Sequence, residues 1–166
     1  MRRSTLVLAA LVAALDQATK WFILLVVMNP PRTIEVTPFF NLVLAYNTGI
    51  AFSLGAMGTR NSSYFFGGLA IVIVIGLLWW LRGQTRTLVH VAGGLVIGGA
   101  IGNIIDRFVH PGVVDFLHFH GWLFNFPPLH GHWPAFNLAD SAIVTGVAIL
   151  VLDGLFGSEK ADKQQG

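Results

Sequence analysis

The sequence predicts an all-α membrane protein: a four-transmembrane-helix bundle with a small extracytoplasmic β-sheet or hairpin subdomain. Composition is the first reason, because 54% of the 166 residues are apolar and only 11% are charged, whereas a soluble domain carries about 25% charged residues. The second reason is that four apolar runs reach the length of about 20 residues that crosses a bilayer. They leave room for a single membrane domain over residues 1–166. The chain has no cysteine, which excludes disulfides and a thiolate nucleophile.

The predicted helices cover residues 5–28, 64–81, 88–109 and 138–156. The first has an alternative interpretation, since its basic start followed by a short apolar run resembles a signal peptide. The apolar run resumes at residues 21–28, however, and this makes a full-length span. The second helix ends in Trp79 and Trp80, which suit the membrane interface. Residues 158–166 are expected to be a disordered tail.

The distribution of basic residues predicts the orientation of the bundle. Six of them belong to the N-terminus, the second connection and the tail: Arg2, Arg3, Arg82, Arg86, Lys160 and Lys163. The first and third connections hold only Arg32 and Arg60, with Arg107 at a helix end. Basic residues favour the cytoplasmic side. Both termini are therefore expected in the cytoplasm, and the first and third connections outside.

Residues 33–54, in the first outer connection, carry a β-strand pattern in which Ile34 and Val36 alternate with polar residues. Further on, residues 42–46 and 50–54 flank the turn-forming Asn47-Thr48-Gly49, which predicts a β-hairpin. An open sheet cannot lie in hydrocarbon, because its edge groups would be unpaired. We therefore expect it at the outer interface, against the bundle. The second outer connection, residues 110–137, is rich in Pro, Gly, His and aromatics and is expected to be irregular.

The third helix is expected to be central. Two neighbouring stripes carry small and then polar residues at a spacing of four: Gly94, Gly98, Gly102 and Asp106 on one, and Gly99, Asn103 and Arg107 on the other. Small residues at this spacing allow close helix contact, and the polar end of the helix faces outward. On the first helix, Asp16 and Lys20 are four residues apart and can pair. Structural ion pairs, Asp16 with Lys20 and Asp106 with Arg107, are a non-catalytic role for these four residues.

Further polar groups are expected at the same level of the membrane. Asn137 is a candidate N-cap of the fourth helix, with Asp140 three positions later. Asp115 lies in the apolar run that follows the third helix. Two close carboxyl groups in apolar surroundings share a proton, so one can take a proton from water while the other donates one. This is the chemistry of an aspartic protease.

Five short motifs follow one another along nearly the whole chain: Asp16-Gln-Ala-Thr-Lys20, Tyr46-Asn-Thr-Gly-Ile-Ala-Phe52, Gly98-Gly-Ala-Ile-Gly-Asn-Ile-Ile-Asp-Arg107, Val113-Val-Asp-Phe116 and Phe136-Asn-Leu-Ala-Asp-Ser141. Together they resemble the prolipoprotein signal peptidase (signal peptidase II) family. The resemblance implies a four-helix intramembrane aspartic protease of the bacterial cytoplasmic (inner) membrane, with its site near the outer face. It implies cleavage just before the diacylglyceryl-modified Cys of prolipoproteins.

The family's catalytic pair falls on Asp115 and Asp140. Residues expected to bind or position substrate are Asn47, Gly49, Asn103, Arg107 and Asn137, whereas Asp16, Lys20 and Asp106 are expected to be structural. The resemblance implies no metal and no cofactor. The expected partners are diacylglyceryl-modified prolipoproteins and membrane lipids, without nucleic acid, and the chain is expected to be a monomer.

Three alternatives stay open. Residues 118–132 are longer and richer in His than is usual for the family, and one metal site could be formed by Asp115, His118, His120, His130 and His132. A proton-coupled carrier could use four carboxylates as a relay, Asp16, Asp106, Asp115 and Asp140, although their clustering at one depth argues against it. A non-catalytic assembly partner would leave Asp115 and Asp140 without a purpose.

Overall fold

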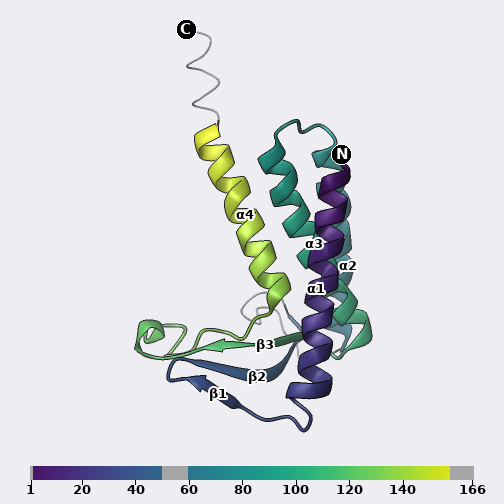
Figure 1. Ribbon diagram of the computed structural model, residues 1–166. Helices are drawn as coiled ribbons and strands as arrows, with labels where there is room; N and C mark the ends of the chain where they lie inside the picture. Colours follow the sequence, from purple (N-terminus) through teal and green to yellow (C-terminus); the bar gives the residue numbers. More distant parts are fainter. Residues whose placement is uncertain (1, 50–59, 158–166) are drawn as a thin grey trace.

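Four long helices and one small sheet make up the computed structural model, which describes residues 2–49 and 60–157 (Figure 1). The helices are α1 (Arg3–Phe22), α2 (Arg60–Leu81), α3 (Thr87–Val109) and α4 (Leu138–Gly157), and α1 continues as the π-helical segment η1 (Ile23–Val27). Each of the four spans, counting η1 with α1, is long and apolar enough to cross a membrane. The start of α1 and the end of α4 both lie at the end of the bundle opposite the sheet (Figure 1).

The helices begin and end close to the predicted positions, except that α2 starts at Arg60 rather than at residue 64. Its first turn consists of polar residues, which carry no hydropathy signal. Ser62 and Ser63 of this turn are nevertheless buried. Burial of small polar residues at a helix start cannot be inferred from a hydropathy pattern.

Helix α3 is central, as predicted, and packs against α1, α2 and α4. Its two glycine stripes face two different helices. A Cβ atom at Gly98 would lie 2.6 Å from the carbonyl oxygen of Ala9 in α1, and one at Gly99 would collide with the carbonyl oxygen of Ala139 in α4. The missing side chains therefore let the backbones of α1 and α4 approach α3 from two sides.

The sheet is antiparallel, with the order β1 (Ile34–Thr37), β2 (Phe40–Asn47), β3 (Val113–Phe119). The predicted strand at residues 42–46 is part of β2. This strand pairs with β1, to which residues 38–39 connect it, and on its other side with β3. Residues 50–54, the predicted second strand of the hairpin, lie outside the described residues.

Strand β3 corrects the prediction that residues 110–137 are irregular. Its register pairs Asn47 with Val113 and Ala45 with Asp115. The two strands are separated in sequence by α2 and α3, so no local pattern reveals their pairing. The single-turn helix η3 (Trp122–Phe124) follows β3.

The sheet packs against the end of α1. Ile23 and Met28 form an apolar cluster with Val114 and Phe116 of β3. The helices themselves leave many large apolar side chains exposed, Val72 among them at 65%, as expected of surfaces that meet lipid. This arrangement places the middle of β3 beside the ends of three helices, where the polar residues gather.

Candidate active site

Asp115 lies in the middle of β3 and is only 2% exposed. Its Oδ1 accepts a hydrogen bond of 2.7 Å from the side-chain amide of Asn137, and Asn47 also hydrogen-bonds it. Burial, and after it the nearby charge of Asp140, raise the pKa of Asp115 to about 7. Below that pH the group is a neutral acid that can donate a proton.

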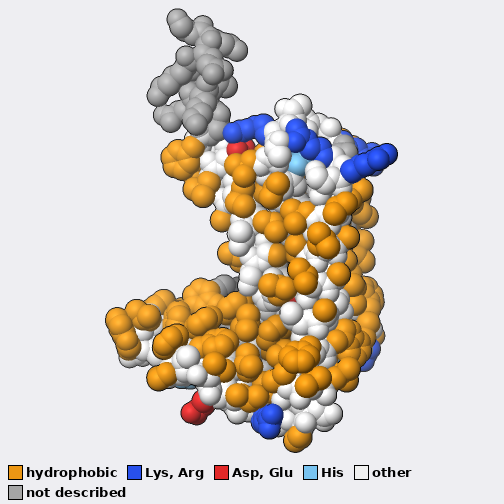
Figure 2. Space-filling model, viewed as in Figure 1, with side chains coloured by type: hydrophobic (Ala, Val, Ile, Leu, Met, Phe, Trp, Pro, Cys, Tyr) orange, Lys and Arg blue, Asp and Glu red, His pale blue; other side chains and the backbone are white. Residues whose placement is uncertain are grey.

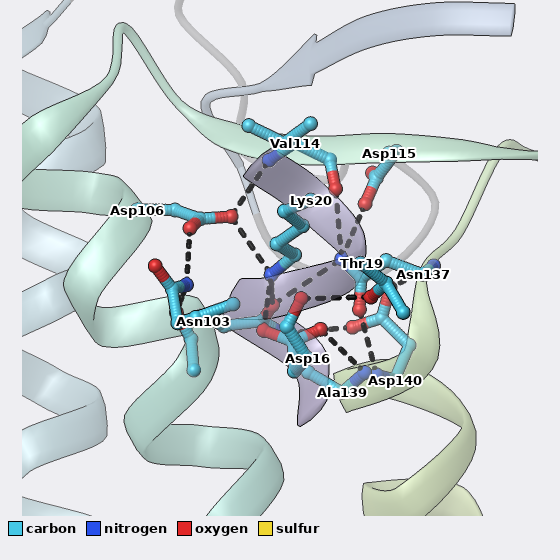
Figure 3. A network of polar contacts seen from close by, with 12 residues as sticks. Asp16, Thr19, Lys20, Asn103, Asp106, Val114, Asp115, Asn137, Ala139 and Asp140 are labelled. Atoms are coloured by element: carbon cyan, nitrogen blue, oxygen red, sulfur yellow. Dashed lines mark hydrogen bonds and ion pairs between the residues drawn. The ribbon is translucent and has the colours of Figure 1, made fainter. Parts of the chain in front are cut away.

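Asp140 lies in the first turn of α4 and caps that helix together with Asn137. The backbone N–H of Asp140 donates to Asn137 Oδ1 at 2.9 Å, and the backbone N–H of Asn137 donates to Asp140 Oδ2 at 3.2 Å. The predicted N-cap is therefore confirmed, in the reciprocal form of a capping box. Because Asn137 also binds Asp115, both carboxyl groups meet on this one residue (Figure 3).

Lys20 connects the first helix to this site. Its Nζ lies 2.8 Å from Asp16 Oδ2 and 2.8 Å from Asp106 Oδ2, and donates to Asn103 Oδ1 at 2.9 Å. Lys20 and both carboxylates are fully buried. The predicted pair of Asp16 with Lys20 is confirmed. Asp16 also accepts a hydrogen bond from the backbone N–H of Ala139 at 2.9 Å, so α1 helps to cap α4.

The predicted pair of Asp106 with Arg107 is wrong. Asp106 faces α1 and β3, where it binds Lys20, the side-chain amide of Gln17 at 2.7 Å and the backbone N–H of Val114 at 2.9 Å. Successive residues of an α-helix point in directions about 100° apart. Arg107 is therefore directed elsewhere.

Arg107 contacts Gly49 and Phe66 instead. Its Nη2 donates to the carbonyl oxygen of Gly49 at 2.5 Å, and its guanidinium lies 5.8 Å from the ring centre of Phe66. Its Nη1 is buried and has no hydrogen-bond partner among residues 2–49 and 60–157. This nitrogen is available to a substrate oxygen.

Asn103 orients Asp140. Its Oδ1 accepts hydrogen bonds from Lys20 and from the Asn137 side chain, at 2.9 Å and 3.2 Å. With its oxygen held in this way, its amide nitrogen donates to Asp140 Oδ1 at 2.8 Å. Lys20 thus acts on Asp140 through Asn103.

A cavity of about 640 Å³ opens beside the carboxyl groups. Its walls come from α2, α3, α4, residues 133–136, the end of β2 and the start of β3. Most of the lining is apolar, with Leu69, Ala100 and Ile143 as examples. Its polar lining includes Asn47, Asn103, Arg107 and Asp140. Asp140 faces the cavity directly. Asp115 is not part of the lining and lies behind it, next to Asn137.

The structure brings the ten residues singled out from the sequence into one region, with Gly49 contributing its carbonyl group. Sequence reasoning missed Gln17, Phe66 and the wall-forming Trp133. Gln17 could have been found, because it shares a helical face with Lys20. The other two carry no signal of their own, since their roles depend on how distant elements pack.

The histidines do not join Asp115. The rings of His118, His120 and His132 lie together, with centroids 5.3 to 6.1 Å apart. Burial, and then the neighbouring His132 and His120, lower the pKa of His118. Over residues 2–49 and 60–157, no group of three or more His, Cys, Asp or Glu could hold a metal ion. This finding contradicts the alternative of a metal site at Asp115.

Comparison with known proteins decides the family. The family model described as "Signal peptidase (SPase) II" matches residues 8–156. The chain belongs to the signal peptidase II family. The match includes all the carboxylates of the site.

Relatives and solved structures agree with this membership. A lipoprotein signal peptidase of Azoarcus sp. (strain BH72) is 49% identical over 88% of this chain and 79% of its own length. The lipoprotein signal peptidase of Aeromonas hydrophila is 45% identical over 93% of this chain and 90% of its own length. A solved structure titled "Bacterial membrane enzyme structure by the in meso method at 2.3 A resolution" superposes with a TM-score of 0.77 at 29% identity, covering 95% of this chain and 90% of the other. This signal peptidase II chain thus shares its fold with that solved structure.

Proposed function

We propose that this chain is an aspartic endopeptidase in which Asp115 and Asp140 form the catalytic pair. As a signal peptidase II, it removes signal peptides from prolipoproteins. The observation that supports the aspartic mechanism is that Asn137 binds both carboxyl groups, one by its side chain and one by its backbone. Cleavage just before the diacylglyceryl-modified Cys is part of the same proposal.

The two carboxyl groups take different roles. Asp140 faces the cavity and lies at a helix N-terminus, where the exposed N–H groups favour an anion. It is the base, and takes a proton from water as the hydroxide attacks the scissile carbonyl carbon. Asp115, with its raised pKa, donates a proton to the carbonyl oxygen. When the tetrahedral intermediate breaks down, Asp140 protonates the leaving nitrogen, and the intermediate's hydroxyl returns a proton to Asp115.

Other residues position these groups and the substrate. Lys20 and Asn103 hold Asp140 in place through the hydrogen bonds described above. Arg107 directs its unpaired Nη1 toward a carbonyl or ester oxygen of the substrate. The apolar walls contributed by α2 and α4 suit lipid chains and an apolar signal sequence.

The proposed orientation places both termini in the cytoplasm and the site near the outer face of the cytoplasmic (inner) membrane. Basic side chains gather at the end of the bundle opposite the sheet (Figure 2), which is the distribution typical of a cytoplasmic side. We further propose that the protein acts as a monomer, without nucleic acid and without a cofactor. A carrier function is not supported, since Asp16, Asp106, Asp115 and Asp140 gather at one end of the bundle and do not form a path across it.

The test is cleavage of a precursor peptide that carries a diacylglyceryl-modified Cys, by the purified protein in lipid. Asp115→Asn and Asp140→Asn are both expected to lose nearly all activity while remaining folded and able to bind the precursor. Asp153→Asn is the matched control, because Asp153 lies at the far end of α4, paired with Arg86. Any residual activity should appear in Asp115→Asn, which keeps a neutral donor beside an ionised Asp140. Wild-type turnover in either site variant would refute the mechanism.

A further inference from the structure

The three-stranded sheet and the loop after β3 project from the helices as a platform, and a loop with exposed aromatic and aliphatic side chains lies at the far end of it (Figure 1). This tip loop (residues 121–131) follows β3 and contains η3. Trp122 is 83% exposed, Leu123 63% and Phe126 51%. Three large apolar side chains exposed on one short loop usually mark a surface that meets another apolar phase.

The backbone of the tip loop is largely paired within the loop itself. Gly121 N donates to Gly131 O at 2.8 Å and closes the loop, while Gly131 N donates to Phe124 O and Leu129 N to Phe126 O, each at 2.8 Å. Internal pairing of backbone polar groups lowers the cost of bringing a loop against an apolar phase, because unpaired groups are costly there. The exposed side chains are therefore carried by an ordered support.

The charges of the platform lie away from this loop. Residues 116–139 contain no Lys, Arg, Asp or Glu. Exposed charges are found instead at the β1 edge, at Arg32 and Glu35. Hydrophobic side chains cover the projecting end of the platform and continue onto the surface of the helices (Figure 2). The tip loop is thus an extension of the surface that the membrane-spanning helices present to lipid.

We propose that the tip loop inserts Trp122, Leu123 and Phe126 into the bilayer leaflet on the sheet side of the membrane. Trp and Phe are favoured at the boundary between headgroups and acyl chains. A second copy of the chain is a poorer occupant, because two aromatic side chains and a leucine offer roughly 500 Å² and a stable interface needs about 800 Å² from each partner.

Insertion has a consequence for the cavity. The ring of Phe124 lies 5.8 Å from the ring of Trp133, centroid to centroid, and Trp133 lines the cavity. An anchored tip loop therefore holds this wall of the cavity at a fixed depth relative to the bilayer surface. If the proposed function holds, this depth is also the one at which a lipid-modified substrate meets the cavity.

The test uses the absence of cysteine in the chain, so that each introduced cysteine is a unique labelling site. Spin labels are placed at Trp122→Cys, at Glu35→Cys as the water reference and at Val72→Cys as the lipid reference, in the full chain in phosphatidylethanolamine–phosphatidylglycerol bilayers. Collision with molecular oxygen, which enters bilayers, is compared with collision with a water-soluble nickel chelate. We expect nickel collision at position 122 to be several-fold lower than at position 35, with oxygen collision close to that at position 72.

Leu123→Cys provides a second position should Trp122→Cys fail to fold. Equal nickel collision at positions 122 and 35 would overturn the proposal, because the tip loop would then lie in water. Low collision with both reagents would also overturn it, since the loop would then be covered by protein, for example by a second copy. No activity is measured, so the outcome is independent of whether Asp115 and Asp140 are catalytic.

Discussion

Asn137 holds the site together at the scale of single residues. Its side-chain nitrogen contacts Asp115 and Asn103, and its backbone and side-chain oxygen cap α4 together with Asp140. Each carboxyl group thus has a fixed neighbour, while their environments differ: Asp115 is enclosed and Asp140 faces the cavity. Environments that differ in this way favour the protonated form of one carboxyl group and the ionised form of the other, which is the condition for acid and base roles in one reaction.

The pH dependence of cleavage should follow Asp115. The proposed mechanism needs this group protonated, and burial together with the charge of Asp140 raises its pKa to about 7. We therefore expect kcat/KM for the lipid-modified precursor to fall as the pH rises through about 7, since kcat/KM reports ionisation of the free enzyme. A value of kcat/KM that stays constant well above this pH would contradict the assignment.

The raised pKa of Asp115 also makes the stability of the fold depend on pH. The pKa of Asp115 in the folded chain lies above the unfolded value of about 3.9, so the folded state keeps the proton over the interval between them. Its contribution to stability is full below the unfolded pKa and is lost as the pH rises through about 7. Asp115→Asn has no ionisation at this position. Its thermal unfolding midpoint should therefore decline less between about pH 4 and about pH 7 than that of the wild type.

Arg107→Lys should impair cleavage without unfolding the protein. Lysine keeps the charge but loses the planar fork that binds Gly49 and lies over Phe66. Loss of a hydrogen bond from a charged group should lower kcat/KM roughly 10- to 100-fold. The thermal midpoint, measured in parallel, should change little. Wild-type kcat/KM in this variant would argue against a positioning role for Arg107.

At the scale of elements, α3 determines how near the other helices come to one another. Its glycines remove side chains where α1 and α4 approach, whereas α2 and α4 each pack on α3 and leave the cavity between them. The polar residues at the end of α3 then reach both neighbours: Asp106 contacts α1, and Asn103 contacts α4.

Gly98→Ala should destabilise the bundle. The added Cβ would lie 2.6 Å from the carbonyl oxygen of Ala9, a backbone atom that cannot move aside alone. Overpacking of this kind costs about 1–3 kcal/mol, more than the helix propensity gained on replacing glycine. Gly76→Ala on α2, where nothing lies within 4 Å, is the matched control and should be neutral or slightly stabilising. Equal thermal midpoints for the two variants in detergent would contradict the packing argument.

At the scale of the whole molecule, local patterns predicted the helices, and the spacing of small and polar residues predicted which face of α3 is buried. Long-range pairing was not predictable. The partnership of β2 with β3 joins segments on either side of α2 and α3, and the preference of Asp106 for Lys20 over Arg107 depends on where α1 lies. The cap at Asn137 was predictable because all of its atoms come from one turn.

The proposed topology can be tested on the intact chain. Reporters fused after Gly157, or inserted within residues 85–87, should report a cytoplasmic position, whereas a reporter inserted near Thr59 should report an external one. The expectation follows from the excess of basic residues at the end of the bundle opposite the sheet. An external signal after Gly157 would exclude the arrangement with both termini inside.

The pairing of Lys20 with Asp16 also bears on how the chain enters the bilayer during synthesis. Both residues belong to α1 and lie one turn apart, so they neutralise each other before any other helix has been made. An unpaired charge would make the transfer of this segment into lipid costly, whereas a local ion pair carries no net charge into it. When α3 and α4 arrive, Lys20 forms a further ion pair with Asp106 and a hydrogen bond with Asn103, and Asp16 accepts a hydrogen bond from the backbone N–H of Ala139. Helix α1, the first segment to be inserted, thus carries Asp16 and Lys20 into the bilayer as a neutral pair. Helix α4, the last segment, later docks on that pair.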